Sequence, residues 1–365
     1  MPGVSTFVLL TNFLEENLVT SCLGPCLELI AGSHLCGRDL QMKKITLEGG
    51  IEVRTFAPSK DFNPLKATPA QLVANGFPTM PDDPKLRERY VRVWNRIKGR
   101  FNYVEPTFRV NSDRVHGPRK GLAAERGQIS YNWSGGVVGV PGGQAFNLVL
   151  SDWTIPGVAT PTNPQTGQGE PGWHYCASWV GIDGDLGSTD VFQAGVESEV
   201  FGTLNGHGET HVTYPWWEWA PLPEVRITNF SVHPGDRILV ILCANEGHGP
   251  TTQGTAFMAN LTTGQYMSFA MNAPSGTRLI GNCAEWIVER PEVRGVTSPL
   301  ADYGEIIFDY CVAGTDGGLV VNADSGDTIQ MTAGQGIISV GELISPQNLV
   351  DCTYVPADPL GGGGQ

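Results

Sequence analysis

The sequence predicts an all-β protein preceded by a partly helical N-terminal segment. A content of 47 glycines and 26 prolines indicates many turns and few long helices. From about residue 128 onward, short alternating apolar runs follow one another at intervals of roughly ten residues. Helical periodicity is confined to residues 60–100. Short strands with period-two alternation, separated by Gly, Pro and Asn, are typical of a β-sandwich or a β-barrel.

The extreme N-terminus has a mixed character. The stretch VSTFVLLTNFL is apolar enough for the core of a signal peptide, but no basic residue precedes it, and Glu15 and Glu16 follow at once. No stretch reaches the roughly 18 uninterrupted apolar residues of a membrane helix. We therefore expect no membrane association. We also expect a secreted protein, with an intracellular form left open as an alternative.

Two helices are predicted in the N-terminal segment. In KATPAQLVANGFP, Thr68 and Gln71 make a capping box, and Gly76 provides a stop. In DDPKLRERYVRVWNRIKGR, Asp83 is the N-cap of an amphipathic helix with a basic outer face. The apolar positions of this helix are Leu86, Tyr90, Val93, Trp94 and Ile97.

Charge divides the chain into two parts. Residues 1–120 carry 17 Lys and Arg against 12 Asp and Glu, a net of +5, whereas residues 121–365 carry 6 against 25, a net of −19. The acidic body argues against nucleic acid as a partner, because phosphate contacts need cations. It fits a protein that works at low pH, where protonation reduces self-repulsion. The polar join at residues 110–127, with the dibasic pair Arg119 and Lys120, is predicted to be an exposed linker.

Neither the cysteines nor the aspartates predict a metal site. The eight cysteines lack the spacing of zinc ligands, although their even number leaves disulfides open. In GIDGDLGSTDVFQA, Asp183 and Asp185 fit the first two ligand positions of an EF-hand, but Gly187 and Ala194 stand at the fifth and twelfth positions. We therefore expect no metal and no cofactor.

Strand parity places polar side chains beside tryptophans on four strands. The opposite faces of these strands are apolar and are predicted to form the core. Each polar residue alone is most simply a solvated group, but four such faces together predict one groove across a sheet. The groove residues are Trp179, Gly181 and Asp183 in SWVGIDGD, Gln193, Gly195 and Glu197 in FQAGVE, Trp216 and Glu218 in WWEWAP, and Glu285, Ile287 and Glu289 in CAEWIVE.

These motifs, in this order and at this spacing, resemble the glutamic peptidases of family G1, the eqolisins. The resemblance rests on SWVGIDGD, FQAGVE, WWEWAP, CAEWIVERP and LADYG, preceded by NWSGGVV and a strand ending in TIP. It covers residues 129–312 and extends to about residue 355. It implies a sandwich of two curved antiparallel sheets of the concanavalin A-like lectin and glucanase type, with endopeptidase activity at acidic pH.

The resemblance also implies the division of the chain and the roles of site residues. A basic pro-region would span residues 1–125, an acidic catalytic domain residues 126–356, and a disordered Gly-rich tail residues 357–365. Gln193 and Glu285 correspond to the catalytic pair. The positions that correspond to substrate-binding residues are Trp179, Asp183, Glu197, Trp216 and Glu218.

The chemistry of the pair agrees with its residue types. An ionised Glu285 can act as a general base toward water, so we expect hydrogen bonds to its carboxylate to keep its pKa low. Gln193 does not titrate, so its amide N–H can stabilise an oxyanion even in strong acid.

The expected partners are protein or peptide substrates of a monomeric enzyme, and the pro-region as an intramolecular inhibitor. We hypothesise that the helix around Trp94 docks on the acidic domain at neutral pH and releases as carboxylates protonate. The family often has a cysteine after GIDGD, and this chain has none there, so Cys283 must pair elsewhere or stay free, with Cys176 as a conceivable partner.

Two other function classes stay open at this point. A non-catalytic, lectin-like sandwich would use the tryptophan-lined groove for sugars. A glycosidase would use two carboxylates such as Glu285 and Glu218. Gln193 favours the peptidase, because a glycosidase would need a carboxylate at that position.

Overall fold

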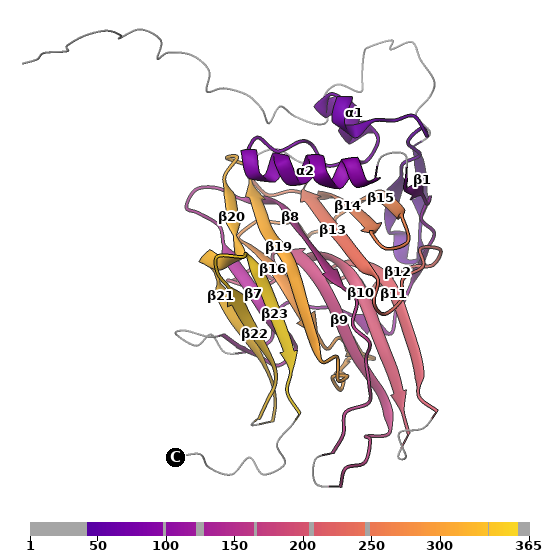
Figure 1. The fold of residues 1–365 in the computed structure, drawn as a ribbon, viewed down its shortest axis with the longest axis vertical. Helices are drawn as coiled ribbons and strands as arrows, with labels where there is room; N and C mark the ends of the chain where they lie inside the picture. The colour runs from indigo at the N-terminus through magenta and orange to yellow at the C-terminus, as the bar shows by residue number, and fades with distance from the viewer. Residues whose placement is uncertain are drawn as a thin grey trace, which may run out of the picture.

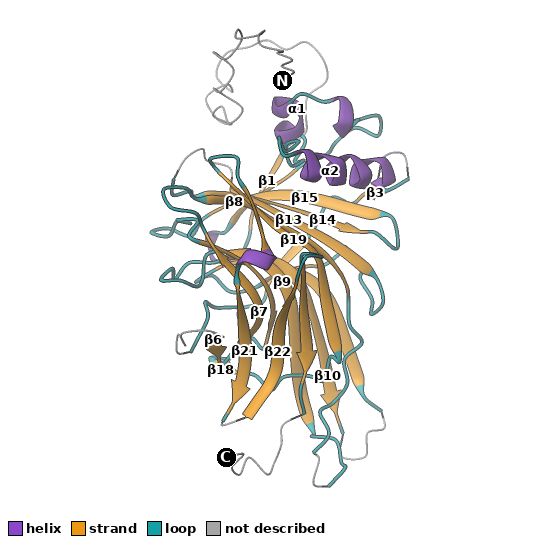
Figure 2. Cartoon of the chain, turned by 60° about the vertical axis from the view of Figure 1, so that its left-hand side comes forward, coloured by secondary structure: helices purple, strands orange, loops and turns teal. Residues whose placement is uncertain are grey.

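The computed structural model describes residues 42–97, 100–121, 128–163, 166–203, 208–244, 249–334 and 336–356. The signal-like stretch, the first three cysteines and the Gly-rich tail lie outside these ranges. The described chain consists mainly of antiparallel strands with few helices, which confirms the all-β prediction (Figure 1, Figure 2). Within these ranges, no helix has the length and apolar character needed to cross a membrane.

The two predicted helices are present with the predicted caps. Helix α1 spans Pro69–Ala74, and its capping box joins the backbone and side chains of Thr68 and Gln71. Helix α2 spans Pro84–Ile97, and Asp83 Oδ1 accepts hydrogen bonds from the backbone N–H groups of its first turn, at 2.9 Å each. The described residues also form three short 3₁₀ helices: η1 (Glu48–Gly50), η2 (Pro64–Lys66) and η3 (Ala323–Ser325).

The strands of the body form one continuous antiparallel ladder. Its order is β12, β11, β10, β9, β16, β7, β21, β22, β23, β19, β8, β13, β14 and β15. The bounds are β7 (Trp133–Gly139), β8 (Phe146–Thr154), β9 (Gly172–Ile182), β10 (Phe192–Gly202), β11 (Thr210–Trp219), β12 (Val225–Ile227), β13 (Arg237–Ala244), β14 (Gln253–Asn260), β15 (Gln265–Asn272), β16 (Cys283–Glu289), β19 (Glu305–Thr315), β21 (Asp327–Ala333), β22 (Gly336–Ile344) and β23 (Leu349–Tyr354). Short strands β6 (Gln128–Ser130) and β20 (Val320–Asn322) pair with β21 and β19.

The N-terminal segment adds strands to both ends of this ladder. Strand β2 (Glu52–Thr55), itself paired with β1 (Lys43–Thr46), pairs with β15, as does β3 (Asn102–Tyr103). Strand β4 (Phe108–Val110) pairs with β12 at the opposite end. A separate small sheet joins β5 (Arg114–Val115), β17 (Glu292–Val293) and β18 (Val296–Thr297).

The main core lies where the ladder folds back on itself. The Trp153 indole of β8 donates a hydrogen bond to Ser178 Oγ of β9 at 3.0 Å, and the Trp286 indole of β16 donates to the Leu150 carbonyl of β8 at 3.0 Å. The predicted apolar strand faces all lie in this core, which confirms the period-two reading. They are Phe192, Ala194 and Val196 of β10, Trp217 and Trp219 of β11, and Ala284, Trp286 and Val288 of β16.

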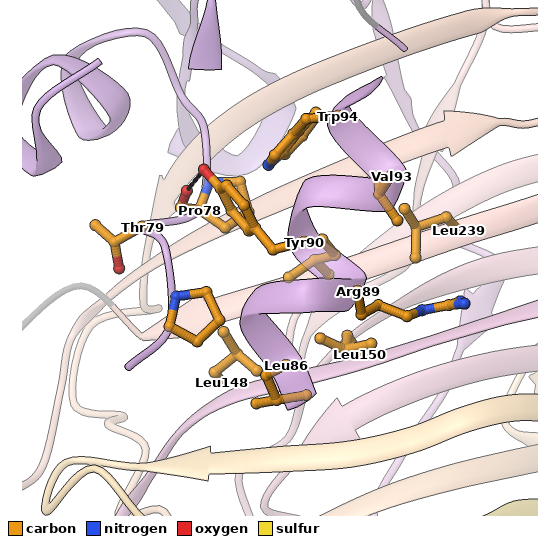
Figure 3. Close-up of a pocket in the computed structure, with 12 residues that line it drawn as sticks. Pro78, Thr79, Leu86, Arg89, Tyr90, Val93, Trp94, Leu148, Leu150 and Leu239 are labelled. Atoms are coloured by element: carbon orange, nitrogen blue, oxygen red, sulfur yellow. Dashed lines mark hydrogen bonds between the residues drawn. The ribbon is translucent and has the colours of Figure 1, made fainter. Parts of the chain in front are cut away.

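Helix α2 packs across β8, β13 and β14 through its apolar face (Figure 1, Figure 3). Trp94 is buried, with its ring centroid 5.0 Å from that of Phe257 and the two planes at 84°. The Tyr90 hydroxyl donates to the Pro78 carbonyl at 2.9 Å at the edge of a small apolar cavity under the helix. Arg89 pairs with Asp152 of β8. The predicted contact between this helix and the acidic half therefore exists, but apolar side chains make most of it.

Candidate active site

Strand β9 positions the two predicted catalytic residues on either side of one glycine. Gln193 of β10 and Glu285 of β16 are both register partners of Gly181 of β9, and both side chains are fully buried. A Cβ atom at Gly181 would lie 2.8 Å from Glu285 Oε1 and 2.7 Å from the Trp179 ring. Glycine at this position therefore leaves the space in which Gln193 and Glu285 share one face of the sheet.

The surroundings of Glu285 differ from the prediction. Both of its carboxylate oxygens are buried, and among the described residues only the weak thiol donor of Cys283 acts on them. Burial, followed by the charges of Asp183 and Asp185, raises its pKa well above the usual range. The prediction that hydrogen bonds keep this pKa low is wrong, because burial and the two neighbouring carboxylates outweigh the one weak donor beside the group.

The cleft is covered by residues 113–120, DRVHGPRK, which we call the strap. Gln193 Nε2 donates a hydrogen bond to the His116 carbonyl oxygen. The His116 backbone N–H donates to the two carboxylate oxygens of Glu218 at 3.1 and 2.9 Å. Arg114 and His116 are buried, so the prediction of an exposed linker is wrong here, because the charges of the strap find partners inside the cleft.

The His116 imidazole is enclosed by an aromatic ring and two carboxylates. It stacks on Trp216 with ring centroids 3.7 Å apart and planes at 10°. Its Nε2 lies 3.0 Å from Glu224 Oε2, and its Nδ1 lies 3.3 Å from Glu289 Oε2. Burial alone would lower the pKa of His116, but the hydrogen bonds with Glu224 and Glu289 outweigh it and raise the pKa to about 10. The ring is therefore a cation held over Trp216.

Arg114 and Arg119 anchor the strap on either side of His116. The Arg114 guanidinium contacts Glu197 at 3.0 Å and Glu199 at 3.1 Å, and lies 4.5 Å from the centre of the Tyr175 ring. Arg119 Nε contacts Asp185 Oδ1 at 2.7 Å. The strap thus crosses the cleft with the buried Arg114 before the His116 carbonyl and the partly buried Arg119 after it.

Carboxyl groups outnumber cations around Arg114 and His116. Five acids contact these two residues, four at their side chains and Glu218 at the His116 backbone N–H. They are Glu197, Glu199, Glu218, Glu224 and Glu289. Burial raises the pKa of Glu197 to about 8 in spite of Arg114 and His116, and burial also raises that of Glu218 well above the usual range. Glu224 differs from these two, because its contacts with His116 outweigh burial and lower its pKa. Burial in the cleft therefore favours the protonated forms of Glu197 and Glu218.

The other predicted site residues fall into two groups. Glu197, Trp216 and Glu218 contact the strap directly, whereas the Trp179 indole donates to Glu289 Oε2 at 2.9 Å and so supports a strap contact. Asp183 instead accepts hydrogen bonds from three consecutive backbone N–H groups, residues 280–282, at 2.6, 3.0 and 2.8 Å. Its carboxylate holds a loop, not the strap.

Sequence reasoning did not identify His116, Arg114 or Arg119 as site residues, nor their partners Glu224 and Asp185. A usable signal was present, because the basic run DRVHGPRK directly precedes an acidic body. Such a run fits an acidic cleft as well as it fits a linker.

One group of described residues has the composition of a cation site. His116, Glu197 and Glu224 bring three donor atoms within 4.8 Å of one another. The Arg114 guanidinium lies on Glu197, however, and its positive charge opposes a metal ion there. The two aspartates considered for calcium are bound to backbone amides and to Arg119. Cys176 and Cys283 are thiols in the structure, and Cys283 Sγ donates to the Asp185 carbonyl at 3.4 Å.

Comparison with known proteins identifies relatives over the body of the chain. The family model described as "Peptidase A4 family" matches residues 131–354, more than half of the sequence. Aspergillopepsin-2 of Aspergillus niger is 29% identical over 252 residues, which cover 66% of this chain and 84% of that protein. Scytalidopepsin B of Scytalidium lignicola is 26% identical over 244 residues, which cover 65% and 79%. A crystal structure of scytalido-glutamic peptidase with a transition state analog inhibitor is similar with a TM-score of 0.50 and 25% identity, covering 62% of this chain and 98% of that one.

Proposed function

The chain belongs to the peptidase A4 family and is a glutamic peptidase, and we propose that it is an acid-acting endopeptidase with Glu285 as general base and Gln193 as oxyanion donor. The observation that carries the proposal is the hydrogen bond from Gln193 Nε2 to the His116 carbonyl. A peptide carbonyl bound by that amide is where an oxyanion would develop during hydrolysis.

In the proposed mechanism, Glu285 removes a proton from a water molecule that attacks the bound carbonyl. Gln193 stabilises the negative charge that forms on the carbonyl oxygen. Glu285 then returns the proton to the leaving amine. The buried position of both side chains opposite Gly181 supports this arrangement, because a shared sheet register fixes them relative to each other.

Acid action follows from the two residue types. Burial raises the pKa of Glu285, and the charges of Asp183 and Asp185 raise it further. Water that enters the cleft would weaken both effects and lower the pKa toward the ordinary range of a glutamate. Glu285 would then be ionised in mild acid, where a histidine base would be fully protonated. The open enzyme should therefore work at low pH.

The proposed substrates are proteins and peptides. Glu218, which accepts from the His116 N–H, would bind the backbone N–H of the residue before the scissile bond. Trp216 would pack against that residue's side chain. Glu197 would contact a side chain two positions earlier, as it contacts Arg114. Glu197, Trp216 and Glu218 are thus proposed as substrate-binding residues.

We further propose that the N-terminal segment is an intramolecular inhibitor and that the monomeric chain is secreted as a zymogen. The strap supports the first part, because it occupies the cleft at Gln193 and Glu218. The finer classification of the fold, a concanavalin A-like sandwich, is part of the same proposal. It is supported by the contacts of Trp153 and Trp286 between the two halves of the ladder.

The glycosidase alternative is less well supported. Glu218 pairs with Gln193, which pairs with Gly181, which pairs with Glu285. Three strand spacings of about 4.8 Å put roughly 14 Å between the Cα atoms of the two glutamates. An amide stands between them, whereas glycosidases need two carboxyl groups about 5–9.5 Å apart across the sugar.

A digestion assay tests the proposal. Denatured protein is incubated over pH 3–6 with the wild type, Glu285→Ala and Gln193→Ala, with Glu342→Ala and Gln347→Ala as exposed controls. We expect cleavage by the wild type and the controls. The loss should be about 10²–10⁴-fold for Glu285→Ala and about 10²–10³-fold for Gln193→Ala. Unchanged cleavage by either variant contradicts the assigned pair. No cleavage by a wild type whose N-terminal segment has been removed by limited proteolysis favours the lectin-like alternative.

A further inference from the structure

The strap runs through the cleft as an extended peptide does, with contacts on both sides of the catalytic residues, and does not merely block one side. Arg114 contacts Glu197 before the His116 carbonyl, and Arg119 contacts Asp185 after it. A plug would need to fill only one side of the catalytic residues. A substrate must be held on both sides of the bond that is cleaved, because only then is the bond fixed against the catalytic groups.

One peptide group of the strap is held by two of the proposed site residues. The His116 N–H is bound by Glu218, and the His116 carbonyl is bound by Gln193. These two contacts fix the carbonyl group of the bond between His116 and Gly117. Gly117 is buried, and a Cβ atom at this position would meet nothing within 4 Å. Glu285 lies across Gly181 from Gln193, on the same face of the sheet.

We infer that the chain hydrolyses its own peptide bond between His116 and Gly117. This inference rests on the proposed function. Glu285 takes a proton from water, and the water oxygen forms a bond to the His116 carbonyl carbon while Gln193 holds the oxyanion. The bond from this carbon to the Gly117 nitrogen then breaks, and that nitrogen takes the proton from Glu285. The products are a carboxyl terminus at His116 and an amino terminus at Gly117.

This cleavage places the end of the pro-region at residue 116 instead of the predicted residue 125. The fragment that ends at His116 keeps its other attachments, because β2 pairs with β15, β4 pairs with β12, and α2 packs on the body. The first product is therefore a two-chain protein whose strap has been cut, not a free catalytic domain.

Self-cleavage is expected to be slow compared with turnover of an added substrate. Burial raises the pKa of Glu285 and so disfavours the ionised form that acts as the base. The seated carbonyl belongs to the same chain, so the half-time should not change when the protein is diluted. An added substrate enters a cleft that contains water, where Glu285 ionises more readily.

The test uses the full chain and two substitutions at Gly117. Wild type, Gly117→Ala and Gly117→Pro are incubated over pH 3–6 and sampled for intact mass and N-terminal sequence. The same samples are assayed for hydrolysis of a denatured protein. The alanine variant has room for its methyl group and should be cut like the wild type, giving an N-terminus at residue 117. The proline variant turns the scissile bond into a tertiary amide and should stay uncut. Hydrogen exchange over the strap checks that it remains seated in each variant.

The outcomes separate this inference from the proposed function. Hydrolysis of the denatured protein by a wild-type chain that is whole, or that is cut at another bond, overturns the inference and leaves the proposed function intact. Absence of both reactions overturns both. A half-time that shortens in proportion to protein concentration overturns cleavage within one chain. If the strap of Gly117→Pro is unseated, the termini found in the wild type and the alanine variant decide the question.

Discussion

Helix α2 and the strap both belong to the basic N-terminal segment, yet different forces hold them to the acidic body. The helix buries Tyr90 and Trp94, while its Arg87 and Arg92 side chains are about half exposed, at 49% and 59%. The strap instead buries its cations, with Arg114 and His116 set among carboxyl groups. The net charge of a segment therefore does not reveal how it attaches. What matters is whether apolar or charged side chains face the partner.

The two contacts should also respond differently to pH. Most of the contact under α2 is apolar and does not titrate. Protonation of Asp152, which pairs with Arg89, should therefore weaken the contact without releasing the helix, contrary to the initial hypothesis. The strap contacts consist of titratable groups. Regulation by pH should therefore act on the strap and leave the helix in place.

The largest effect on the helix side is expected for Trp94→Ala. Removing a buried tryptophan from the contact with Phe257 should lower the free energy of unfolding by about 3–5 kcal/mol. Denaturant unfolding at neutral pH measures this, with Arg92→Ala on the exposed face as the control. A loss below 1 kcal/mol would mean that the helix does not unfold together with the body.

The matching change in the strap is Arg114→Ala. It leaves Glu197 and Glu199 facing each other without their cation and should weaken seating of the strap by about 3 kcal/mol. Hydrogen exchange over residues 113–120 should accelerate about 100-fold, while exchange in α2 stays unchanged. Lys120→Ala is the control, because its pair with Glu292 is partly exposed and is worth at most about 1 kcal/mol. An equal increase of hydrogen exchange in the strap and in α2 would show that the two segments do not attach independently.

A pH series provides the third test. The pKa of His116 is raised to about 10, so its stabilisation of the seated strap is complete below pH 6.5 and is lost as the pH rises through 10. Glu197, with its pKa raised to about 8, acts in the same direction, and its contribution is lost between about pH 4.5 and 8. Glu224, with a lowered pKa, acts in the opposite direction and loses its contribution below about pH 4.5.

The strap should therefore be held most firmly in mild acid, and its hydrogen exchange, corrected for the intrinsic rate, should increase from pH 6 to pH 10. Exchange in α2, used as the internal control, should change much less. Constant protection of the strap across this range would show that its charges do not control seating.

The smallest expected effect concerns the start of the helix. Asp83→Ala removes the acceptor for two backbone N–H groups and should cost about 1 kcal/mol of unfolding free energy. Asp82→Ala, which removes an exposed pair with Arg87, should cost less than about 0.5 kcal/mol. Strap exchange should be the same in both variants. A change in the strap would mean that helix and strap are coupled.

The parts of the fold that were predicted correctly depend on local patterns. The capping box at Thr68 and the i, i+4 spacing around Trp94 lie within one helix each, and the period-two alternation of β10 lies within one strand. Asp183 shows where such a pattern ends. Strand β9 stops at Ile182, and Asp183 has a φ of 69°, so parity no longer gives the direction of its side chain.

The strap could not be predicted in this way because its partners are distant in sequence. Arg114 and Glu197 are 83 residues apart, and the run that contains Arg114 has the composition of an exposed linker. The raised pKa of Glu285 was missed for the same reason, since it depends on what covers the residue. The catalytic assignment of Gln193 came from the family resemblance. The register opposite Gly181 became visible only in the structure.

The strands that the N-terminal segment adds have a consequence for solubility. The body ladder begins at β12 and ends at β15, and β4 covers the first of these edges while β2 and β3 cover the second. Without these strands, both edges would present unpaired backbone N–H and C=O groups, which are templates for pairing with another molecule. The N-terminal segment is therefore expected also to protect the body from aggregation. A chain that lost this segment entirely would expose two unpaired edge strands, β12 and β15.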